Sequence, residues 1–212
     1  MEQMQTEGMW GALSRELFSD HSAESHLETE RLLLRPFCQE DDALILRISS
    51  DPGTVKYLYR WGLPGSTPQS DMEGFLGYAL GEWDQSPVRV REYCIVLKAT
   101  GESLGEGSVE YSETDDVAEL GWILLPEHRG KGYVTEMARE LIRFAFEEMA
   151  VKKVIAHCDA RNAPSYRVME RLDMHLEEVE KECRPAKTVG GVMGDEMTWV
   201  ISREDWEKAR EK

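Results

Sequence analysis

The most constraining feature of this sequence is a stripe of apolar residues that recurs at helical spacing. The stripe consists of Val134, Met137, Ala138, Leu141, Ile142, Ala145 and Met149. Residues three and four positions apart lie on one face of an α-helix, so the pattern predicts an amphipathic helix. An apolar face of this kind is typical of a helix that packs on the core of a globular domain.

The segments on either side of this helix alternate between strand-like and turn-like residues. Strands are predicted at 31–35, 93–98, 103–111, 117–125, 153–158, 175–183 and 196–202, and further helices at 39–50, 67–83 and 165–172. Short turns join the three strands between 93 and 125, which indicates consecutive antiparallel pairing. The fold class is therefore predicted as mixed α/β, with a central sheet and flanking helices.

The chain has 212 residues, enough for one domain with a substantial core. We expect an N-terminal extension, residues 1–27, followed by a single domain, residues 28–212. The extension carries Trp10, Leu13 and Leu17 at helical spacing and is either a short amphipathic helix or a flexible arm. The formal net charge of −16 disfavours nucleic acid and anionic membranes as partners, because both would repel the chain.

Nothing in the sequence directs the chain to a membrane or a secretory route. No apolar run approaches the roughly 18 residues that span a bilayer, and the N-terminus lacks the basic and apolar regions of a signal peptide. We therefore expect a cytoplasmic protein. The four cysteines lie far apart, without a Cys-x-x-Cys pair or a histidine at ligand spacing, so we expect neither a metal site nor a disulfide framework.

The segment 126–136 carries the clearest functional signal. Gly130 and Gly132 separate the predicted strand at 117–125 from the amphipathic helix. The first amides of a helix have no partners inside it and lie at the positive end of its dipole, and glycines let a phosphate approach them. Arg129 and Lys131 add positive charge in an acidic chain. Together these features predict a site for phosphate or pyrophosphate.

Two other phosphate motifs do not fit this segment. A Walker A loop requires glycine at position 125, where this chain has leucine. The run Gly105-Glu106-Gly107 is followed by Glu110 and a strand, whereas a Rossmann fingerprint needs a third glycine and a helix. An ordinary strand-to-helix turn remains the alternative interpretation of the two glycines.

Several motifs together resemble the GCN5-related N-acetyltransferase (GNAT) superfamily, and within it the RimJ/RimL branch of ribosomal-protein-alanine acetyltransferases. They are Glu119-Leu120-Gly121-Trp122-Ile123-Leu124, Pro126-Glu127, Arg129-Gly130-Lys131-Gly132-Tyr133, Thr29-Glu30-Arg31-Leu32-Leu33-Leu34-Arg35-Pro36 and Asn162-Ala163-Pro164-Ser165. The resemblance covers about residues 29–205. It implies a mostly antiparallel sheet of about seven strands, with a splay between the two middle, parallel strands, and acetyl-CoA as cosubstrate.

The resemblance also assigns residues to the cosubstrate. It implies that the backbone amides of one loop cradle the CoA pyrophosphate: Arg129, Gly130, Lys131, Gly132, Tyr133, Val134 and Thr135. The backbone of Ile123 and Leu124 would bind the pantetheine arm like an added strand, and Asn162 would hold the CoA chain. The sequence departs from the family at Val134, where glycine or alanine is usual, and at Asp173, where glycine is usual.

Acetyl transfer to an amine requires a base for the amine and a proton for the leaving thiolate. Glu119, on the strand before the loop, is the expected base, with an ordinary surface glutamate as the alternative. Ser165 and Tyr166, at the start of the helix after Asn162, are the two candidate proton donors. We expect His157 and Cys158 to be core residues, because the family's chemistry is direct transfer without an acyl-enzyme.

The acceptor is expected to be an amine, with a basic molecule favoured by the acidic chain. Its pocket is expected between segments 51–66 and 184–195, where Tyr57, Tyr59, Trp61 and Met193 lie. The predicted function is direct acetyl transfer to a primary amine of a protein N-terminus, a peptide or a small molecule. Non-catalytic acyl-CoA binding or sensing is the alternative, and a purely structural role is the third. Monomer and homodimer both stay open.

Overall fold

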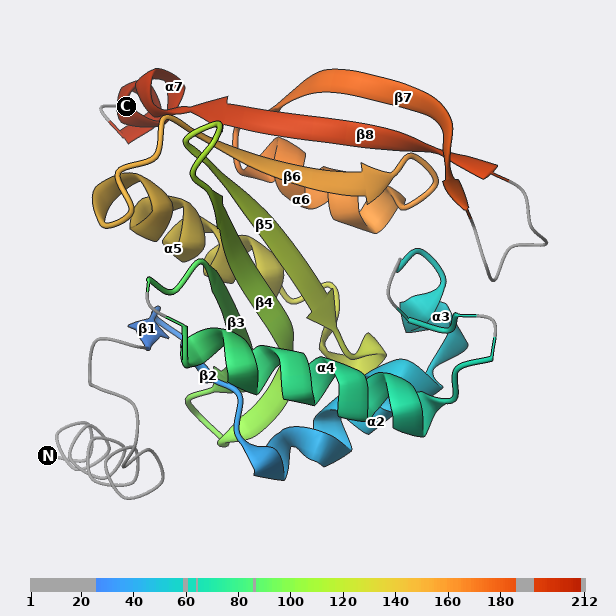
Figure 1. The fold of residues 1–212 in the computed structure, drawn as a ribbon. Helices are drawn as coiled ribbons and strands as arrows, with labels where there is room; N and C mark the ends of the chain where they lie inside the picture. Colours follow the sequence, from blue (N-terminus) through green and yellow to red (C-terminus); the bar gives the residue numbers. More distant parts are fainter. Residues whose placement is uncertain (1–25, 59–60, 64, 86, 186–192, 211–212) are drawn as a thin grey trace, which may run out of the picture.

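The computed structural model describes residues 26–58, 61–63, 65–85, 87–185 and 193–210. Eight described strands form one sheet in the order β1-β2-β3-β4-β5-β6-β8-β7 (Figure 1). They are β1 (Leu27–Glu28), β2 (Leu32–Pro36), β3 (Val90–Leu97), β4 (Glu102–Ser112), β5 (Val117–Leu124), β6 (Lys153–Asp159), β7 (His175–Pro185) and β8 (Met193–Ser202). The mixed α/β class is confirmed, and the two-residue β1 accounts for the eighth strand. The predicted helical stripe at Trp10, Leu13 and Leu17 lies outside the described residues.

Helices cover both sides of this sheet (Figure 1). They are α2 (Asp42–Ser50), α3 (Pro52–Val55), α4 (Pro68–Trp83), α5 (Tyr133–Glu147), α6 (Ala163–Arg171) and α7 (Arg203–Arg210). One buried apolar cluster joins α5 and α6 to the sheet, and a second joins α2 and α4 to β2 and β3. We call the two sides the α5 face and the α4 face. None of the described helices is both long and apolar enough to cross a membrane.

The amphipathic helix expected from the apolar stripe is confirmed as α5. Five of the seven stripe residues are buried; Val134 is half-buried, and Met149 is a half-buried residue beyond the end of the helix. Met137 is fully buried and lies over β4 at Gly107, where a Cβ atom would come within 2.2 Å of the Met137 sulfur. Glycine at position 107 therefore lets α5 approach the sheet closely.

The middle of the sheet contains its single described parallel pair, β5 and β6. Their register runs from Val117 opposite Lys153 to Leu120 opposite Ala156. Both strands then continue, β5 to Leu124 and β6 to Asp159, without pairing to each other. The strands therefore diverge toward their carboxyl ends, which confirms the expected splay. We call this opening the fork.

The departure from the family at Asp173 has a clear backbone explanation. Asp173 follows α6 and adopts φ +58°, in the left-handed region that favours glycine. Aspartate is among the few residues other than glycine that adopt this conformation, because its short polar side chain can bond locally. The turn after α6 therefore has a left-handed residue, a conformation that aspartate can adopt.

A buried ion pair fixes the connection between β2 and α2. Arg35 donates to both carboxylate oxygens of Asp41, at 2.6 and 2.7 Å, and the Cys38 amide donates to the same carboxylate at 2.9 Å. Burial opposes ionisation of Asp41, but the hydrogen bonds and charge of Arg35, with the Cys38 bonds, outweigh it and lower the pKa of Asp41. The carboxylate is thus charged in the folded protein and holds the first turn of this segment on the sheet.

We expect Asp41→Ala to lower the free energy of unfolding by about 3 kcal/mol, because it removes the carboxylate that neutralises a buried guanidinium. The pKa of Asp41 is lower in the folded protein than in the unfolded chain. The ion pair therefore contributes fully to the free energy of unfolding above the usual aspartate pKa of about 4, and this contribution is lost as the pH falls through the pKa of Asp41 in the folded protein. Urea unfolding between pH 3 and 7 measures both effects. Glu113→Ala, which breaks an exposed pair with Arg89, is the control and should cost less than about 1 kcal/mol. Equal losses for the two variants would contradict the prediction.

Candidate active site

The loop between β5 and α5 has the form of an anion site. After a short 3-10 helix, Pro126–His128, both Gly130 and Gly132 adopt left-handed backbone conformations, with φ of +74° and +81°. Gly132 occupies the N-cap position of α5, so no side chain caps the helix. The amides of the first turn therefore have no partner within α5 and lie at the positive end of its dipole, as the sequence predicted.

The start of α5 is held by the segment between β1 and β2. Glu136 accepts hydrogen bonds from the Thr29 hydroxyl at 2.5 Å, the Arg31 amide at 2.8 Å and the Arg31 Nε at 2.6 Å. Arg31 also donates to the Lys131 carbonyl at 3.1 Å and lies over the Tyr133 ring, 4.6 Å from its centroid. We call Thr29, Arg31 and Glu136 the clamp.

Burial of Glu136 opposes its ionisation, but the bonds from Thr29 and Arg31 outweigh burial, so the pKa of Glu136 lies below its ordinary value. The clamp is therefore ionised at neutral pH. In the sequence, residues 29–36 stand out only as part of the family resemblance, which assigns no role to Thr29 or Arg31. The clamp partners are more than 100 residues apart, and no local pattern pairs them.

The side chain of Arg129 turns away from the glycine loop. Its guanidinium donates twice to the Leu124 carbonyl, at 3.0 and 2.8 Å, and once to the Thr54 hydroxyl at 2.7 Å. Thr54 is buried in α3, whose N-cap Asp51 accepts from the Thr54 amide. Arg129 therefore ties the end of β5 to α3 although it is an exposed residue, and Lys131 is a second exposed cation of the loop.

The expected base, Glu119, lies on β5 at the level of the fork. Its neighbours Ala118 and Leu120 belong to the buried cluster on the α5 face, so Glu119 points to the α4 face. About half of its side chain is exposed, and its Oε2 is 3.9 Å from Nε2 of His157 on β6. The geometry thus places an accessible carboxylate directly beside the diverging strands.

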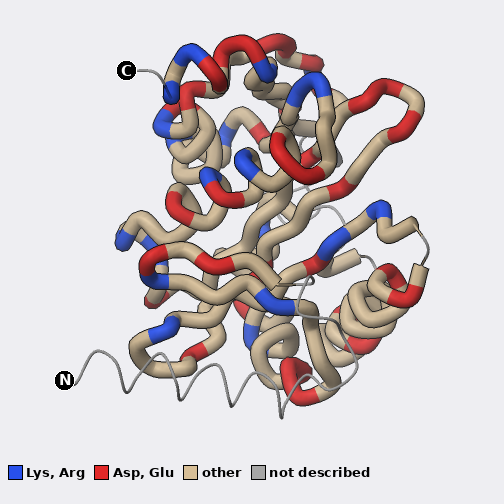
Figure 2. The backbone as a smooth tube through the Cα atoms, turned by 90° about the vertical axis from the view of Figure 1, so that its left-hand side faces the viewer, with Lys and Arg blue, Asp and Glu red and all other residues tan. Residues whose placement is uncertain are grey.

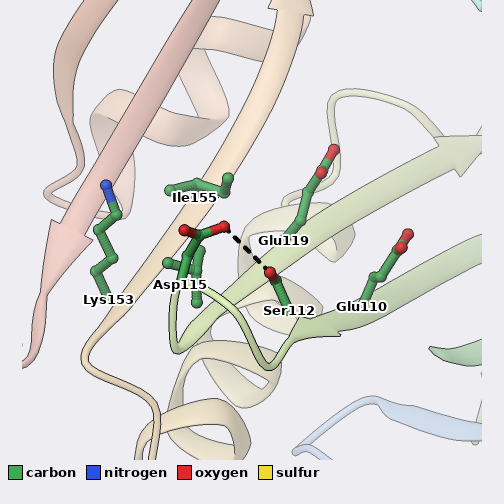
Figure 3. A pocket seen from close by; sticks show the side chains of 7 residues that line it. Glu110, Ser112, Asp115, Glu119, Lys153 and Ile155 are labelled. Atoms are coloured by element: carbon green, nitrogen blue, oxygen red, sulfur yellow. Dashed lines mark hydrogen bonds between the residues drawn. The ribbon is translucent and has the colours of Figure 1, made fainter. Parts of the chain in front are cut away.

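Glu119 also lines a cavity of about 330 Å³ (Figure 3). The other lining residues are Glu110, Ser112, Asp115, Val117, Lys153 and Ile155. The side chains of Glu110 and Glu119 project to the same side from neighbouring strands, where the two residues face each other in the register of β4 and β5. The cavity therefore has an acidic rim beside the candidate base.

The first turn of α6 supplies the remaining expected residues. Asn162 occupies the N-cap position, but its side chain makes no capping hydrogen bond; its carbonyl accepts from the Ser165 amide at 2.9 Å. Ser165 and Tyr166 are both half-buried, and the Tyr166 ring stacks on Trp199 with centroids 6.5 Å apart. Because α6 begins just after β6, its first turn lies at the same sheet edge as the loop that follows β5.

Two side chains can be compared with the sequence-based expectations. Trp61, for which the core was the alternative to a place in the pocket, is a core residue: it is 6% exposed and packs 5.2 Å from the Phe75 ring on the α4 face. The expectation for His157 is wrong. His157 is not a core residue, because it is half-buried at the fork beside Glu119. Cys158, next to it on β6, is buried as expected.

The structure describes only some of the other residues that were expected to line the pocket for the acceptor amine. Tyr57 is half-buried and Met193 is exposed, while Tyr59 and most of the 184–195 loop lie outside the described residues. Among the residues that the structure describes, no group of three or more histidine, cysteine, aspartate or glutamate side chains is arranged to hold a metal ion.

Comparison with known proteins identifies the family. Residues 31–175 match the Acetyltransferase (GNAT) domain. The chain is 30% identical to the uncharacterized N-acetyltransferase YnaD of Bacillus subtilis over 185 residues, covering 85% of this chain and 99% of YnaD. It also superposes on the crystal structure of a GNAT-family acetyltransferase from Bacillus anthracis with a TM-score of 0.70 and 27% identity, over 84% of this chain and 99% of the other.

A more distant structural neighbour belongs to the branch that the sequence resembles. RimJ of Mycobacterium smegmatis, solved with a CoA disulfide, aligns with a TM-score of 0.69 over 82% of this chain and 83% of RimJ. At 18% identity this likeness shows a shared fold. The family match, the B. subtilis relative and the solved structures agree, and the chain belongs to the GNAT family of N-acetyltransferases.

Proposed function

We propose that this protein transfers the acetyl group of acetyl-CoA directly to a primary amine of a protein N-terminus, a peptide or a small molecule. The observation that carries the proposal is the juxtaposition at the fork. The accessible Glu119 carboxylate lies one residue before the point where β5 and β6 diverge, and the diverging end of β5 leads into the loop before the uncapped start of α5. The start of α5 could bind a phosphate, the gap between β5 and β6 could bind an extended chain, and Glu119 could act as the base beside that gap.

The described geometry fits the expected cosubstrate. The amides of residues 129–135 would bind the pyrophosphate, since two left-handed glycines leave the approach to the helix start free of side chains. The end of β5 at Ile123 and Leu124 is paired with β4 but not with β6, and Arg129 occupies the Leu124 carbonyl. The remaining backbone groups that face the fork would bind the pantetheine arm, with Asn162 on the opposite side of the fork. RimJ of Mycobacterium smegmatis, which shares the fold, was solved with a CoA disulfide, and this supports CoA as the ligand.

The proposed reaction is a single displacement. Glu119 removes a proton from the acceptor ammonium, and the freed amine attacks the thioester carbonyl. The new C–N bond forms as the C–S bond breaks, and the second proton of the amine is lost as the thiolate is protonated. Ser165 and Tyr166 are both proposed donors to the thiolate, because both belong to the first turn of α6.

The acceptor is proposed to be cationic. The cavity beside Glu119 has Glu110 and Asp115 on its rim, and acidic residues are spread widely over the described backbone (Figure 2). A carboxylate-lined approach attracts an ammonium group and repels anions. CoA is an anion, and an acidic protein would repel it. The glycine loop offsets this repulsion locally, because Lys131 and the positive end of the α5 dipole lie there.

Substitution of Arg31 tests whether the clamp prepares the loop for CoA. We expect Arg31→Ala to weaken CoA binding about fivefold, because α5 loses the contacts that fix its first turn and about 1 kcal/mol of ordering then opposes binding. Isothermal titration calorimetry with CoA measures the change. Arg89→Ala, which removes an arginine from an exposed pair, is the matched control. An unchanged Kd for Arg31→Ala would show that the clamp does not prepare the loop.

Substitution of Glu119 tests its role as the base. Glu119→Gln should lower kcat by roughly 100-fold while leaving CoA binding unchanged, because a positioned base contributes on that scale and the carboxylate does not face the pyrophosphate loop. Release of the CoA thiol across a panel of amines measures kcat. Glu113→Gln removes an exposed carboxylate from the β4–β5 hairpin and should have no effect. Absence of thiol release by the unmodified protein with every amine would contradict the proposed function itself.

A further inference from the structure

Three strands contribute side chains to one chain of contacts on the α4 face. Nε2 of His157 on β6 is 3.9 Å from Oε2 of Glu119 on β5. On its other side, Nδ1 of the same ring is 3.2 Å from Oε1 of Glu196 and 3.1 Å from the Thr198 hydroxyl, both on β8. His157 is the residue that follows Ala156, the last residue of β6 paired with β5. The imidazole therefore bridges the fork.

The strand alternation explains why these groups meet. On β6, Val154, Ala156 and Cys158 belong to the buried cluster on the α5 face, so His157 points the other way. In the register of β6 and β8, His157 lies opposite Thr198. On β8, Trp199 packs on the α5 face, which directs its neighbour Thr198 to the side of His157. None of these partners is adjacent to His157 in sequence.

Two partners of Nδ1 bear on the tautomer of the ring. An ionised carboxylate only accepts hydrogen bonds, so a hydrogen bond to Glu196 needs a hydrogen on Nδ1, whereas the Thr198 hydroxyl can either accept from Nδ1 or donate to it. We assign the Nδ1–H tautomer from the Glu196 contact. In the neutral ring Nε2 then carries a lone pair, and that lone pair faces the Glu119 carboxylate. Two acceptors face each other across this gap, and one proton placed between them would turn the contact into a hydrogen bond.

A carboxylate lies on each side of the ring. Glu119 from β5 and Glu196 from β8 both contact it. Two other charged residues share this face of β6: Asp159 is paired with Arg161 at 2.6 Å, and Lys153 is paired with Glu177 at 3.5 Å. The ring therefore stands between the proposed base and a second carboxylate that can orient it.

We propose that His157 receives the proton that Glu119 removes from the acceptor amine, and that Glu196 positions His157 for this role. The inference rests on the proposed function. The ammonium gives one proton to the Glu119 carboxylate, which passes it to Nε2 of His157 and becomes a carboxylate again. The amine forms the C–N bond as the C–S bond breaks, the second amine proton goes to the thiolate, and His157 releases its proton to solvent.

The distance of 3.9 Å between Nε2 and Oε2 is longer than a hydrogen bond. Catalytic contacts are often long in the absence of substrate and tighten in the reacting complex. Half of the Glu119 side chain is exposed, so its carboxylate can turn toward the ring without disturbing the core. Glu196 is 18% exposed and His157 23% exposed, which leaves these two groups more tightly held than Glu119.

The first test needs no substrate. In protein labelled with ¹⁵N-histidine, two-bond ¹⁵N–¹H spectra distinguish the two neutral tautomers, and the spectrum of His157→Asn assigns the His157 signals. We expect the Nδ1–H tautomer in the unmodified protein and a mixture of tautomers in Glu196→Gln, whose amide can also donate. Glu180→Gln removes an exposed carboxylate of β7 that faces Glu196 in the sheet register and should change nothing. An Nε2–H tautomer in the unmodified protein would overturn the proposal.

The second test measures kcat against pH with an amine that the unmodified protein acetylates. His157→Asn keeps a donor toward Glu196 but has no proton acceptor for Glu119, and kcat should fall by about 100-fold. Glu196→Gln removes the carboxylate that holds the ring, so kcat should fall by less than it does in His157→Asn while KM stays unchanged. A role of Glu196 in folding alone would leave the kcat of the folded protein unchanged.

Chemical rescue separates a proton role from a folding defect. Added imidazole should restore part of the kcat of His157→Ala and should not affect Glu119→Gln. Full activity of His157→Asn with an unchanged pH profile would overturn the relay while leaving acetyl transfer by Glu119 intact. Failure of the unmodified protein to acetylate any amine would instead contradict the proposed function, and the tautomer measurement would still decide whether Glu196 holds His157.

Discussion

The pairing of β5 with β6 stops at Leu120 and Ala156, and the candidate site is arranged around the gap beyond that point. Parallel strands carry their following helices at the same edge of the sheet, so α5 and α6 both begin beside the gap. Had the two strands stayed paired to their ends, backbone groups would have satisfied one another across the opening. The missing ladder leaves main-chain donors and acceptors for another extended chain.

Long-range side-chain contacts fix the rim of this gap. Arg31 and Thr29 hold Glu136 at the start of α5, and Arg129 joins the end of β5 to Thr54 in α3. The first contact holds the loop that is proposed to bind phosphate, and the second links the end of β5 to α3. The glycine loop itself contributes little rigidity, because glycine restricts the backbone less than any other residue.

Features that depend on local pattern could be predicted from the sequence. The stripe that became α5, the antiparallel strands 93–125 and the two glycines before a helix all have short-range signatures. The roles of Arg31, Thr54 and Glu196 had none, because each depends on a partner brought close by the sheet register or by packing. For Trp61, an aromatic residue in a loop segment, the sequence left a pocket and the core as alternatives, and packing against Phe75 decides for the core. His157 was misassigned because strand alternation alone does not show which face its neighbours leave open.

The clamp between Glu136 and the β1–β2 segment joins parts of the chain separated by more than 100 residues. The loop proposed to bind phosphate, residues 129–135, is therefore complete only when the β1–β2 segment and α5 have both docked on the sheet. A cosubstrate bound at the proposed site would bind the assembled domain and not a fragment of it, so its binding energy would add to the stability of the entire fold by mass action. The supply of cosubstrate would then be one determinant of how long the folded chain persists.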